Sequence, residues 1–128
     1  MTAQSSLRRA SRPESRAVLS KALLRAAELL GLSSARLARV LGVSEASISR
    51  LVTGARTIDP ESKEGELALI LVRVYRSLDA LVGADDAQRK AWMRGHNRAL
   101  NGKPAELIER AEGLVAVVSY LDAMRAPA

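Results

Sequence analysis

The 128-residue sequence contains no cysteine and no phenylalanine, and it has only one tryptophan and two tyrosines. Without cysteine, a disulfide framework and a thiolate metal site are excluded, and this agrees with a reducing cytoplasm. No apolar run approaches the roughly 20 residues of a membrane span, so we expect no membrane partner. Because 48% of the residues are hydrophobic but few are aromatic, the core must consist of Leu, Val, Ile and Ala.

The scarcity of strand-forming residues bears directly on the fold class. Leu and Ala favour helices, whereas aromatic and β-branched residues favour strands. No segment alternates apolar and polar residues over the length of a strand. The sequence therefore predicts an all-α protein.

The sequence also lacks the residue combinations of an enzyme. It has one histidine, His96, and no glycine-rich phosphate loop. His96 has no nucleophile or metal partner within reach in the sequence, and Asp85 and Asp86 suit a helix cap and a first-turn acid better than a catalytic pair. We therefore predict a protein without catalytic activity, cofactor or metal.

Positive charge is concentrated in the first half of the chain. Residues 1–58 contain ten Lys and Arg against three acids, whereas residues 59–128 contain ten against eleven. A basic front half suits a polyanionic partner, most simply nucleic acid. A solvated basic surface without such a partner is the alternative.

Apolar periodicity and glycine positions divide the chain into four predicted parts. They are a disordered basic tail at 1–13, a first helical unit at 14–60, a long connecting helix at 61–84 and a C-terminal half at 85–128. Within the first unit, a helix is expected from about Glu14 to Leu30. Two short helices follow, the first capped by Ser33 or Ser34 and the second by Ser44 and ended by Gly54.

The long connecting helix, from about Glu61 to Val82, is apolar on more than one side. Leu69 and Val72 lie off its main apolar face. A helix that is apolar nearly all round is buried on more than one side. In so short a chain this favours a protein partner or a homodimer or higher assembly.

Three shorter helices are predicted in the last part of the chain. Asp85 caps one that contains Trp92 and ends near Leu100. Pro104 suits the first position of a second short helix. Gly113 is expected to separate that helix from the last one.

The segment LARVLGVSEASISRLVTG, residues 37–54, carries the sharpest motif. Two short helices that cross at a tight turn need a small residue at the crossing, a glycine in the turn and an apolar anchor in the second helix. Ala38, Gly42 and Ile48 meet these needs at the right spacing. The segment resembles the Xre-type, phage-repressor-like helix-turn-helix, with an ordinary helical hairpin as the alternative.

If this motif binds DNA, the helix that Ser44 caps enters the major groove with its N-terminus first. Arg50 is suited to guanine and Glu45 to the amine of cytosine. The side chains expected at base edges are those of Glu45, Ala46, Ser49 and Arg50. The side chains expected near phosphates are those of Arg36, Arg39, Ser47, Thr53 and Arg56. Ser44, which caps the helix, is also expected in the DNA interface. For each single residue, a surface position without DNA contact is the alternative.

The stretch AWMRGHNRALNGKPAELIERAEGLVAVVSYLDAMR, residues 91–125, resembles the Xre/MbcA/ParS toxin-binding domain. The residues that carry the resemblance are Trp92, Asn97, Leu100, Gly102, Pro104, Leu107, Gly113, Val117 and Leu121. The order of the two parts is also that of the family. The resemblance thus predicts an antitoxin with a helix-turn-helix half and a small helical toxin-binding half.

In this family the partner is a RES-domain toxin that consumes NAD. The resemblance implies that the chain covers the mouth of the toxin's active site, and that the complex represses its own operon in the bacterial cytoplasm. Toxin contacts are expected from Asn97, Lys103, Pro104, Val115, Tyr120, Met124 and Arg125.

Several of these assignments have alternatives. Trp92 suits the core better than an interface, whereas Val115 and Tyr120 suit both equally. Arg125 is suited to an anionic cleft of the toxin, or simply complements the C-terminus of its helix. A transcription regulator without a toxin partner, and an interaction module with a vestigial helix-turn-helix, also agree with the sequence.

Overall fold

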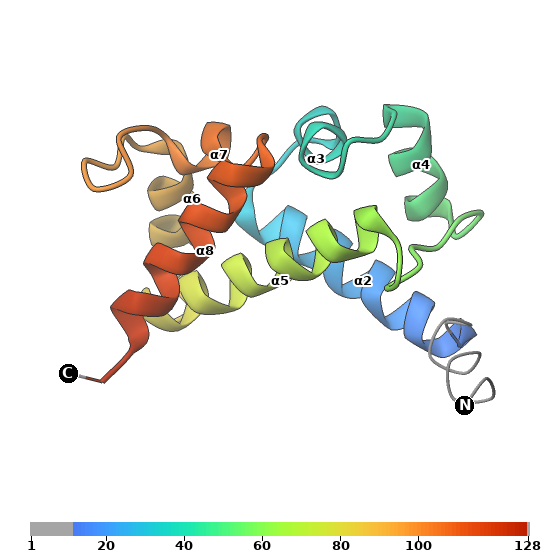
Figure 1. Ribbon diagram of the computed structural model, residues 1–128, viewed down its shortest axis with the longest axis horizontal. Helices are drawn as coiled ribbons and strands as arrows, with labels where there is room; N and C mark the ends of the chain where they lie inside the picture. Colours follow the sequence, from blue (N-terminus) through green and yellow to red (C-terminus); the bar gives the residue numbers. More distant parts are fainter. Residues whose placement is uncertain (1–11, 128) are drawn as a thin grey trace.

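A computed structural model describes residues 12–127 of the protein, and over this range every regular element is a helix and no strand is present (Figure 1). The prediction of an all-α protein is therefore confirmed. The helices are α2 (Pro13–Leu30), α3 (Ser34–Leu41), α4 (Glu45–Thr53), α5 (Lys63–Leu81), α6 (Asp86–Arg94), α7 (Pro104–Leu107) and α8 (Ala111–Arg125). The predicted basic tail at 1–13 lies, up to residue 11, outside the described residues.

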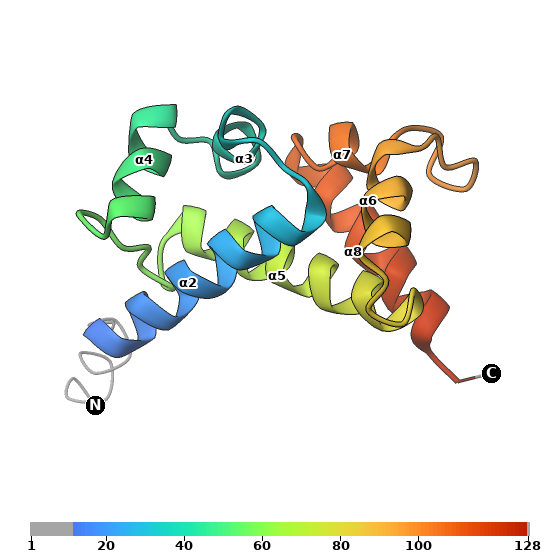
Figure 2. The same ribbon diagram turned by 180° about the vertical axis from the view of Figure 1, so that it is seen from behind.

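Two long helices, α2 and α5, pack along each other and form the base of the molecule (Figures 1 and 2). The short helices α3 and α4 lie over one end of this pair. Helices α6, α7 and α8 lie over the other end, where α8 packs against α5. No helix within residues 12–127 has both the length and the apolar composition needed to cross a membrane.

One aliphatic core runs through both ends of the molecule. The largest side chains that are almost completely buried are Leu23, Leu30, Ile48, Ile58, Leu71, Leu78, Met93, Ile108, Leu114 and Leu121. Burial of each such side chain stabilises the fold by about 1.5–3 kcal/mol. Because the same cluster includes residues of α3, α5 and α8, the two halves are joined through α5.

Four helices begin at side-chain caps. The hydroxyl of Ser33 accepts a hydrogen bond from Arg36 N, that of Ser44 from Ser47 N, and the carboxylate of Asp85 from Gln88 N. These three caps are as the sequence predicts, with Ser33 chosen over Ser34. Helix α5 begins later than predicted, because Ser62 caps it through Gly65 N at 3.0 Å.

Two boundaries in the last part of the chain were predicted wrongly. Helix α6 ends at Arg94, well before Leu100, because Asn97 and Gly102 close a turn through a pair of backbone hydrogen bonds. Gly113 does not separate two helices, because α8 begins at Ala111 and includes it. A Cβ at Gly113 would lie 2.0 Å from the carbonyl oxygen of Leu107, so the glycine permits the close approach of the preceding turn.

The two-sided apolar character of α5 is largely explained within the chain. Helix α5 packs against α2 on one side and against α8 on the other. Val72, which lies off the main apolar face, is buried with 5% of its surface exposed. Leu69 is 47% exposed, and on α2 Val18 is 66% exposed. An apolar surface is thus left at the outer side of the α2–α5 pair.

Candidate functional site

Helices α3 and α4 cross at a tight turn around Gly42. Gly42 has a φ of +70°, which a residue without a Cβ adopts at little cost, and Val43 N donates to Ala38 O at 3.0 Å. Ala38 and Ile48 are buried at the crossing. The arrangement has the steep crossing and the small residue that a helix-turn-helix requires.

One side of α4 is buried and the other is open to solvent. Ile48 and Leu51 anchor the helix in the core, with 1% and 4% of their surfaces exposed. The four side chains expected at base edges, Glu45, Ala46, Ser49 and Arg50, are all exposed. The helix therefore presents its N-terminal half to solvent as a DNA-reading helix would.

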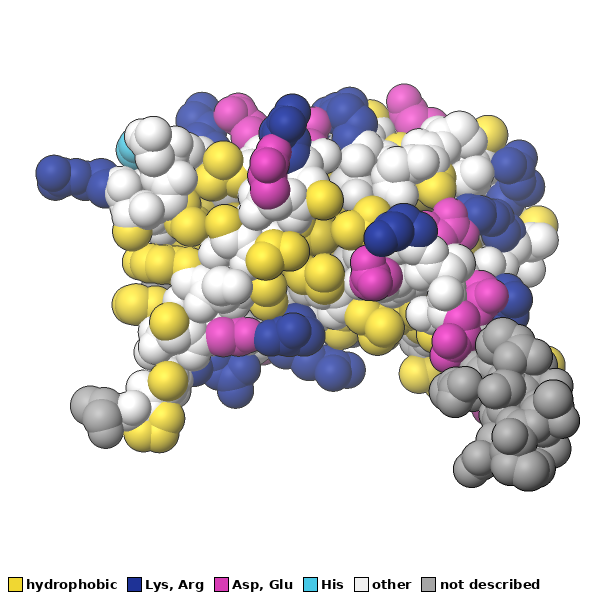
Figure 3. Space-filling model, viewed as in Figure 1, with side chains coloured by type: hydrophobic (Ala, Val, Ile, Leu, Met, Phe, Trp, Pro, Cys, Tyr) yellow, Lys and Arg dark blue, Asp and Glu magenta, His cyan; other side chains and the backbone are white. Residues whose placement is uncertain are grey.

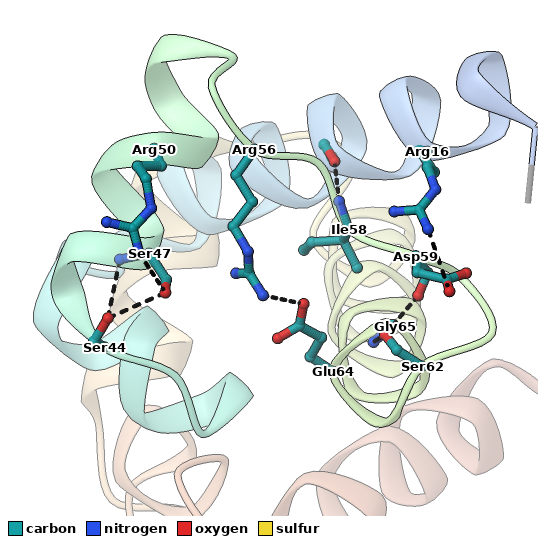
Figure 4. Close-up of polar contacts among 11 residues, drawn as sticks. Arg16, Ser44, Ser47, Arg50, Arg56, Ile58, Asp59, Ser62, Glu64 and Gly65 are labelled. Carbon is teal, nitrogen blue, oxygen red and sulfur yellow. Dashed lines mark hydrogen bonds and ion pairs between the residues drawn. The ribbon is translucent and has the colours of Figure 1, made fainter.

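Ser44, Ser47, Arg50 and Thr53 form a hydrogen-bonded row along α4. Figure 4 shows the first three of these residues. The Ser44 hydroxyl donates to Ser47 Oγ at 3.1 Å, and Arg50 Nη2 donates to the same oxygen at 3.4 Å. The Thr53 hydroxyl donates to the carbonyl of Arg50. Arg50 is thus folded back along its own helix by one long, exposed hydrogen bond, which a better acceptor would replace easily.

The three arginines expected near phosphates make ion pairs within the chain. Arg56 Nη2 lies 2.5 Å from Glu64 Oε1, as Figure 4 shows, and its Nη1 is buried without a hydrogen-bond partner among the described residues. Arg36 Nε and Arg39 Nε lie 2.8 and 2.7 Å from the two carboxylate oxygens of Glu109. DNA phosphates would therefore have to replace carboxylates at these arginines.

The contact with Glu109 affects the protonation of both partners. The hydrogen bond from Arg39 is the main cause that lowers the pKa of Glu109, and burial opposes it. The same hydrogen bond raises the pKa of Arg39. Glu109 lies 70 residues from Arg39 in the chain. Sequence reasoning missed it, because no local pattern links residues so far apart.

The turn between α6 and α7 contains three residues expected to contact a toxin, but they are not equivalent. Asn97 Oδ1 accepts from Leu100 N at 3.0 Å, and its backbone pairs with Gly102. Pro104 is buried as the first residue of α7, whereas Lys103 is exposed. Asn97 and Pro104 thus shape the turn, and Lys103 is the side chain that it presents to solvent.

Helix α8 has exposed apolar side chains on both flanks of its buried side. Val115 and Met124 are 48% and 55% exposed. Tyr120 is partly buried and stacks on Trp92 of α6, with ring centroids 6.4 Å apart. Trp92 is half-buried at the edge of the core rather than inside it. Figure 3 shows hydrophobic side chains gathered over α8 and its junction with α5.

Arg125, at the end of α8, is tied back to α5. Its Nη1 donates to Ser77 Oγ at 3.1 Å, and the Ser77 hydroxyl donates to Asp122 Oδ1 at 2.8 Å. Arg73 of α5 pairs with the other oxygen of Asp122. The hydrogen bond from Ser77 is the main cause that lowers the pKa of Asp122, with Arg73 and Arg125 adding to it against burial.

Two family models match the chain, one for each end of this molecule. The model of the antitoxin Xre-like helix-turn-helix domain matches residues 9–73, which is half of the chain. The model of the antitoxin Xre/MbcA/ParS C-terminal toxin-binding domain matches residues 77–126. No curated protein matches the sequence. The junction between the two matches, residues 74–76, falls inside α5.

Proposed function

The chain belongs to the Xre-like helix-turn-helix antitoxins, and from this premise we propose that its partner is a RES-domain toxin that consumes NAD. As an antitoxin with a toxin-binding domain, it combines two roles in one chain. We assign occlusion of the toxin's active site to the C-terminal helices and repression of its own operon to α4. Each role uses a different exposed surface.

The observation that carries the toxin-binding proposal is the set of exposed apolar side chains on α8. Val115 and Met124 are open to solvent, and Met124 lies one turn after Tyr120, which stacks on Trp92. Large apolar side chains and aromatic residues are enriched in the centres of protein interfaces. Lys103 adds a charged side chain that is free to reach a partner, whereas Asn97 and Pro104 contribute through the shape of their turn.

Arg125 can contact the toxin only after its hydrogen bond within the chain is broken. In the free protein its guanidinium is hydrogen-bonded to Ser77, so it reaches an anionic cleft of the toxin only after that bond is exchanged. A guanidinium pairs well with phosphate or carboxylate groups. Because Arg125 itself is exposed and has a single neutral acceptor in Ser77, a bidentate anion in the toxin would be the better partner.

Co-expression with the adjacent gene tests toxin neutralisation. We expect wild-type protein to permit growth, and Val115→Glu to permit growth arrest with loss of cellular NAD, because a carboxylate would be buried in the interface. Val52→Glu is the matched control, since Val52 is 64% exposed but belongs to α4. Full neutralisation by the Val115 variant would contradict the assignment to α8, and growth arrest without loss of NAD would contradict a RES toxin.

We propose that α4 reads DNA through Glu45, Ala46, Ser49 and Arg50. All four side chains are exposed, and the bond that holds Arg50 to Ser47 is long. Arg50→Ala should weaken binding to the DNA upstream of the gene by about 1–3 kcal/mol if Arg50 contacts a guanine. Arg94→Ala, an exposed arginine of α6, is the control. Fluorescence anisotropy measures the DNA affinity of both variants. Equal affinities of the two variants would contradict the proposal that Arg50 reads a base.

We also propose that the free protein is a homodimer. Val18 and Leu69 leave an exposed apolar surface on the α2–α5 pair. Operators of helix-turn-helix proteins are two-fold, so a dimer would place two copies of α4 in successive major grooves.

A further inference from the structure

Glu109 joins the two family-matched regions through a pair of guanidinium groups. It lies in the turn between α7 and α8, within the toxin-binding region, whereas Arg36 and Arg39 lie on α3 in the helix-turn-helix region. Arg36 Nε and Arg39 Nε donate to different oxygens of the one carboxylate, at 2.8 and 2.7 Å. The carboxylate is 21% exposed, so the pair of contacts is reachable from solvent.

Two guanidinium groups that bracket one anion would suit a DNA phosphate equally well. Arginine binds phosphate and carboxylate with the same planar donor geometry. In a helix-turn-helix bound to DNA, the first helix of the motif crosses the phosphate backbone while the second enters the groove. Helix α3 is that first helix, so its two arginines lie on the element that approaches phosphates.

We propose that Arg36 and Arg39 form a phosphate site for the DNA backbone, and that Glu109 occupies this site in the free protein as an internal competitor. The inference rests on the proposed DNA binding by α4 and adds to it a link with the toxin-binding region. Arg39 is 54% exposed, and ion pairs at such exposure are weak. A phosphate can therefore displace the carboxylate.

This competition couples the two surfaces in both directions. A partner that draws the α7–α8 turn away from α3 frees the two arginines and strengthens DNA binding. By thermodynamic reciprocity, DNA that captures the arginines weakens the hold of α3 on that turn by the same factor. The link is direct, because no residue has to relay it between Glu109 and α3.

The test compares two Glu→Gln variants of the full chain in binding to a fluorescein-labelled, mixed-sequence 24-base-pair duplex. Phosphate contact does not depend on sequence, so this probe suffices. Glu112→Gln is the matched control, because it makes the same change in charge three residues away but pairs with Arg110 rather than α3. Glutamine keeps a hydrogen-bond acceptor at position 109, and circular dichroism checks that both variants fold.

We expect Glu109→Gln to tighten binding by about 5-fold or more at low salt, within the usual range of coupling between sites. The plot of log affinity against log salt should steepen by up to about 1.8, since two phosphate contacts gain strength. Glu112→Gln should change affinity less than about 2-fold and leave the slope unaltered, because surface charges at this distance are screened. Arg39→Gln should abolish the gain when it is added to Glu109→Gln.

Three other outcomes would each overturn a named part of the proposal. Equal effects of Glu109→Gln and Glu112→Gln would overturn the competition while leaving DNA binding by α4 intact. A gain that persists in the Glu109→Gln, Arg39→Gln double variant would overturn the phosphate site at Arg39. Failure of the wild-type chain to bind the duplex at any salt concentration would overturn the proposed DNA binding itself, and this inference with it.

Discussion

Asp122 shows how one carboxylate fixes the end of a helix in this protein. It accepts a hydrogen bond from Ser77, whose side chain is almost completely buried, and it pairs with Arg73. Arg125 donates to the same serine from the last turn of α8. The end of α8 is therefore held against α5 by a small polar network rather than by apolar packing alone. The hydroxyl of Ser77 donates to Asp122 and accepts from Arg125, so it links the two residues of α8.

The lowered pKa of Asp122 makes this network sensitive to acid. A carboxyl group whose folded pKa is below its unfolded value contributes stability above the unfolded pKa, and loses it as the pH falls through the folded pKa. Asp122→Asn should lower the free energy of unfolding by about 1 kcal/mol at pH 7, because the amide has one acceptor oxygen for the two donors Ser77 and Arg73, and one such hydrogen bond has about that net value. At a pH below both pKa values the two proteins should be almost equally stable.

Urea unfolding at neutral and at acid pH measures this difference. Glu66→Gln is the control, because Glu66 pairs only with Lys63 at an exposed position and should change stability little at either pH. A deficit of the Asp122 variant that persisted unchanged in acid would show that the charge of Asp122 does not stabilise the fold.

At the scale of the helices, two glycines inside helices set how closely neighbouring segments approach. A Cβ at Gly65 of α5 would lie 2.1 Å from the carbonyl oxygen of Asp59, and one at Gly113 of α8 would lie 2.0 Å from that of Leu107. Both distances are far below van der Waals contact. These glycines therefore fix how the chain enters α5 and α8, although each glycine lowers the intrinsic helix propensity.

Gly113→Ala should lower the stability of the fold, although alanine is the better helix former. Propensity alone would stabilise the variant by about 1 kcal/mol. The overlap with the Leu107 carbonyl requires the α7–α8 turn to move, and such overpacking costs about 1–3 kcal/mol. Thermal unfolding followed by circular dichroism measures the sign. Ala116→Gly, on an exposed position of α8, gives the size of the propensity effect alone, and a stabilised Gly113 variant would contradict the close approach.

Local signals in the sequence were sufficient for most helix starts but not for every boundary. Ser33, Ser44 and Asp85 were identified as caps because a cap and its backbone partner lie three residues apart. Gly113 was misassigned because a glycine that ends a helix and one that admits a neighbouring carbonyl leave the same local pattern. Glu109 was missed because an ion pair between distant segments has no periodicity to reveal it.

The candidate surfaces were predictable to a similar degree. The exposed side of α4 agrees with the resemblance to a helix-turn-helix, whose docking geometry is the reason that Glu45 and Arg50 were expected there. The sequence pattern does not show which partner each exposed side chain has within the folded chain. The pairing of Arg56 with Glu64, and the tie between Arg125 and Ser77, depend on how separate helices meet.

At the scale of the whole molecule, α5 is shared by the two functional halves. It packs against α2 and α3 of the helix-turn-helix region and against α8 of the toxin-binding region. The hydrophobic core is continuous through it. The two halves are therefore joined by a shared core and by the ion pairs of Glu109, rather than by a flexible linker.

The outer side of the α2–α5 pair is where we expect the second copy of the chain. A groove of about 340 Å³ lies there between the two helices, with Val18, Leu69 and Val72 among its lining residues. Glu14 and Arg76 also line it, so an acid and a base flank one apolar centre. In a two-fold interface, a residue i of one copy contacts a residue j of the other copy, and residue j of the first copy contacts residue i of the second. A surface that carries both an acid and a base can therefore pair with a second copy of itself.

Leu69→Glu should convert the dimer to a monomer without unfolding it. Leu69 is 47% exposed in the single chain, so glutamate is tolerated there by the fold but would be buried without a partner in the dimer. Light scattering at micromolar concentration measures the mass, with Val52→Glu as the control for a charge placed on an exposed valine elsewhere. If dimerisation aligns two copies of α4 on DNA, the monomeric variant should also bind a two-fold operator far more weakly than the dimer does, because it makes only one half-site interaction at a time. A monomeric wild-type protein, or a Leu69 variant that remains dimeric, would contradict this assignment of the α2–α5 surface.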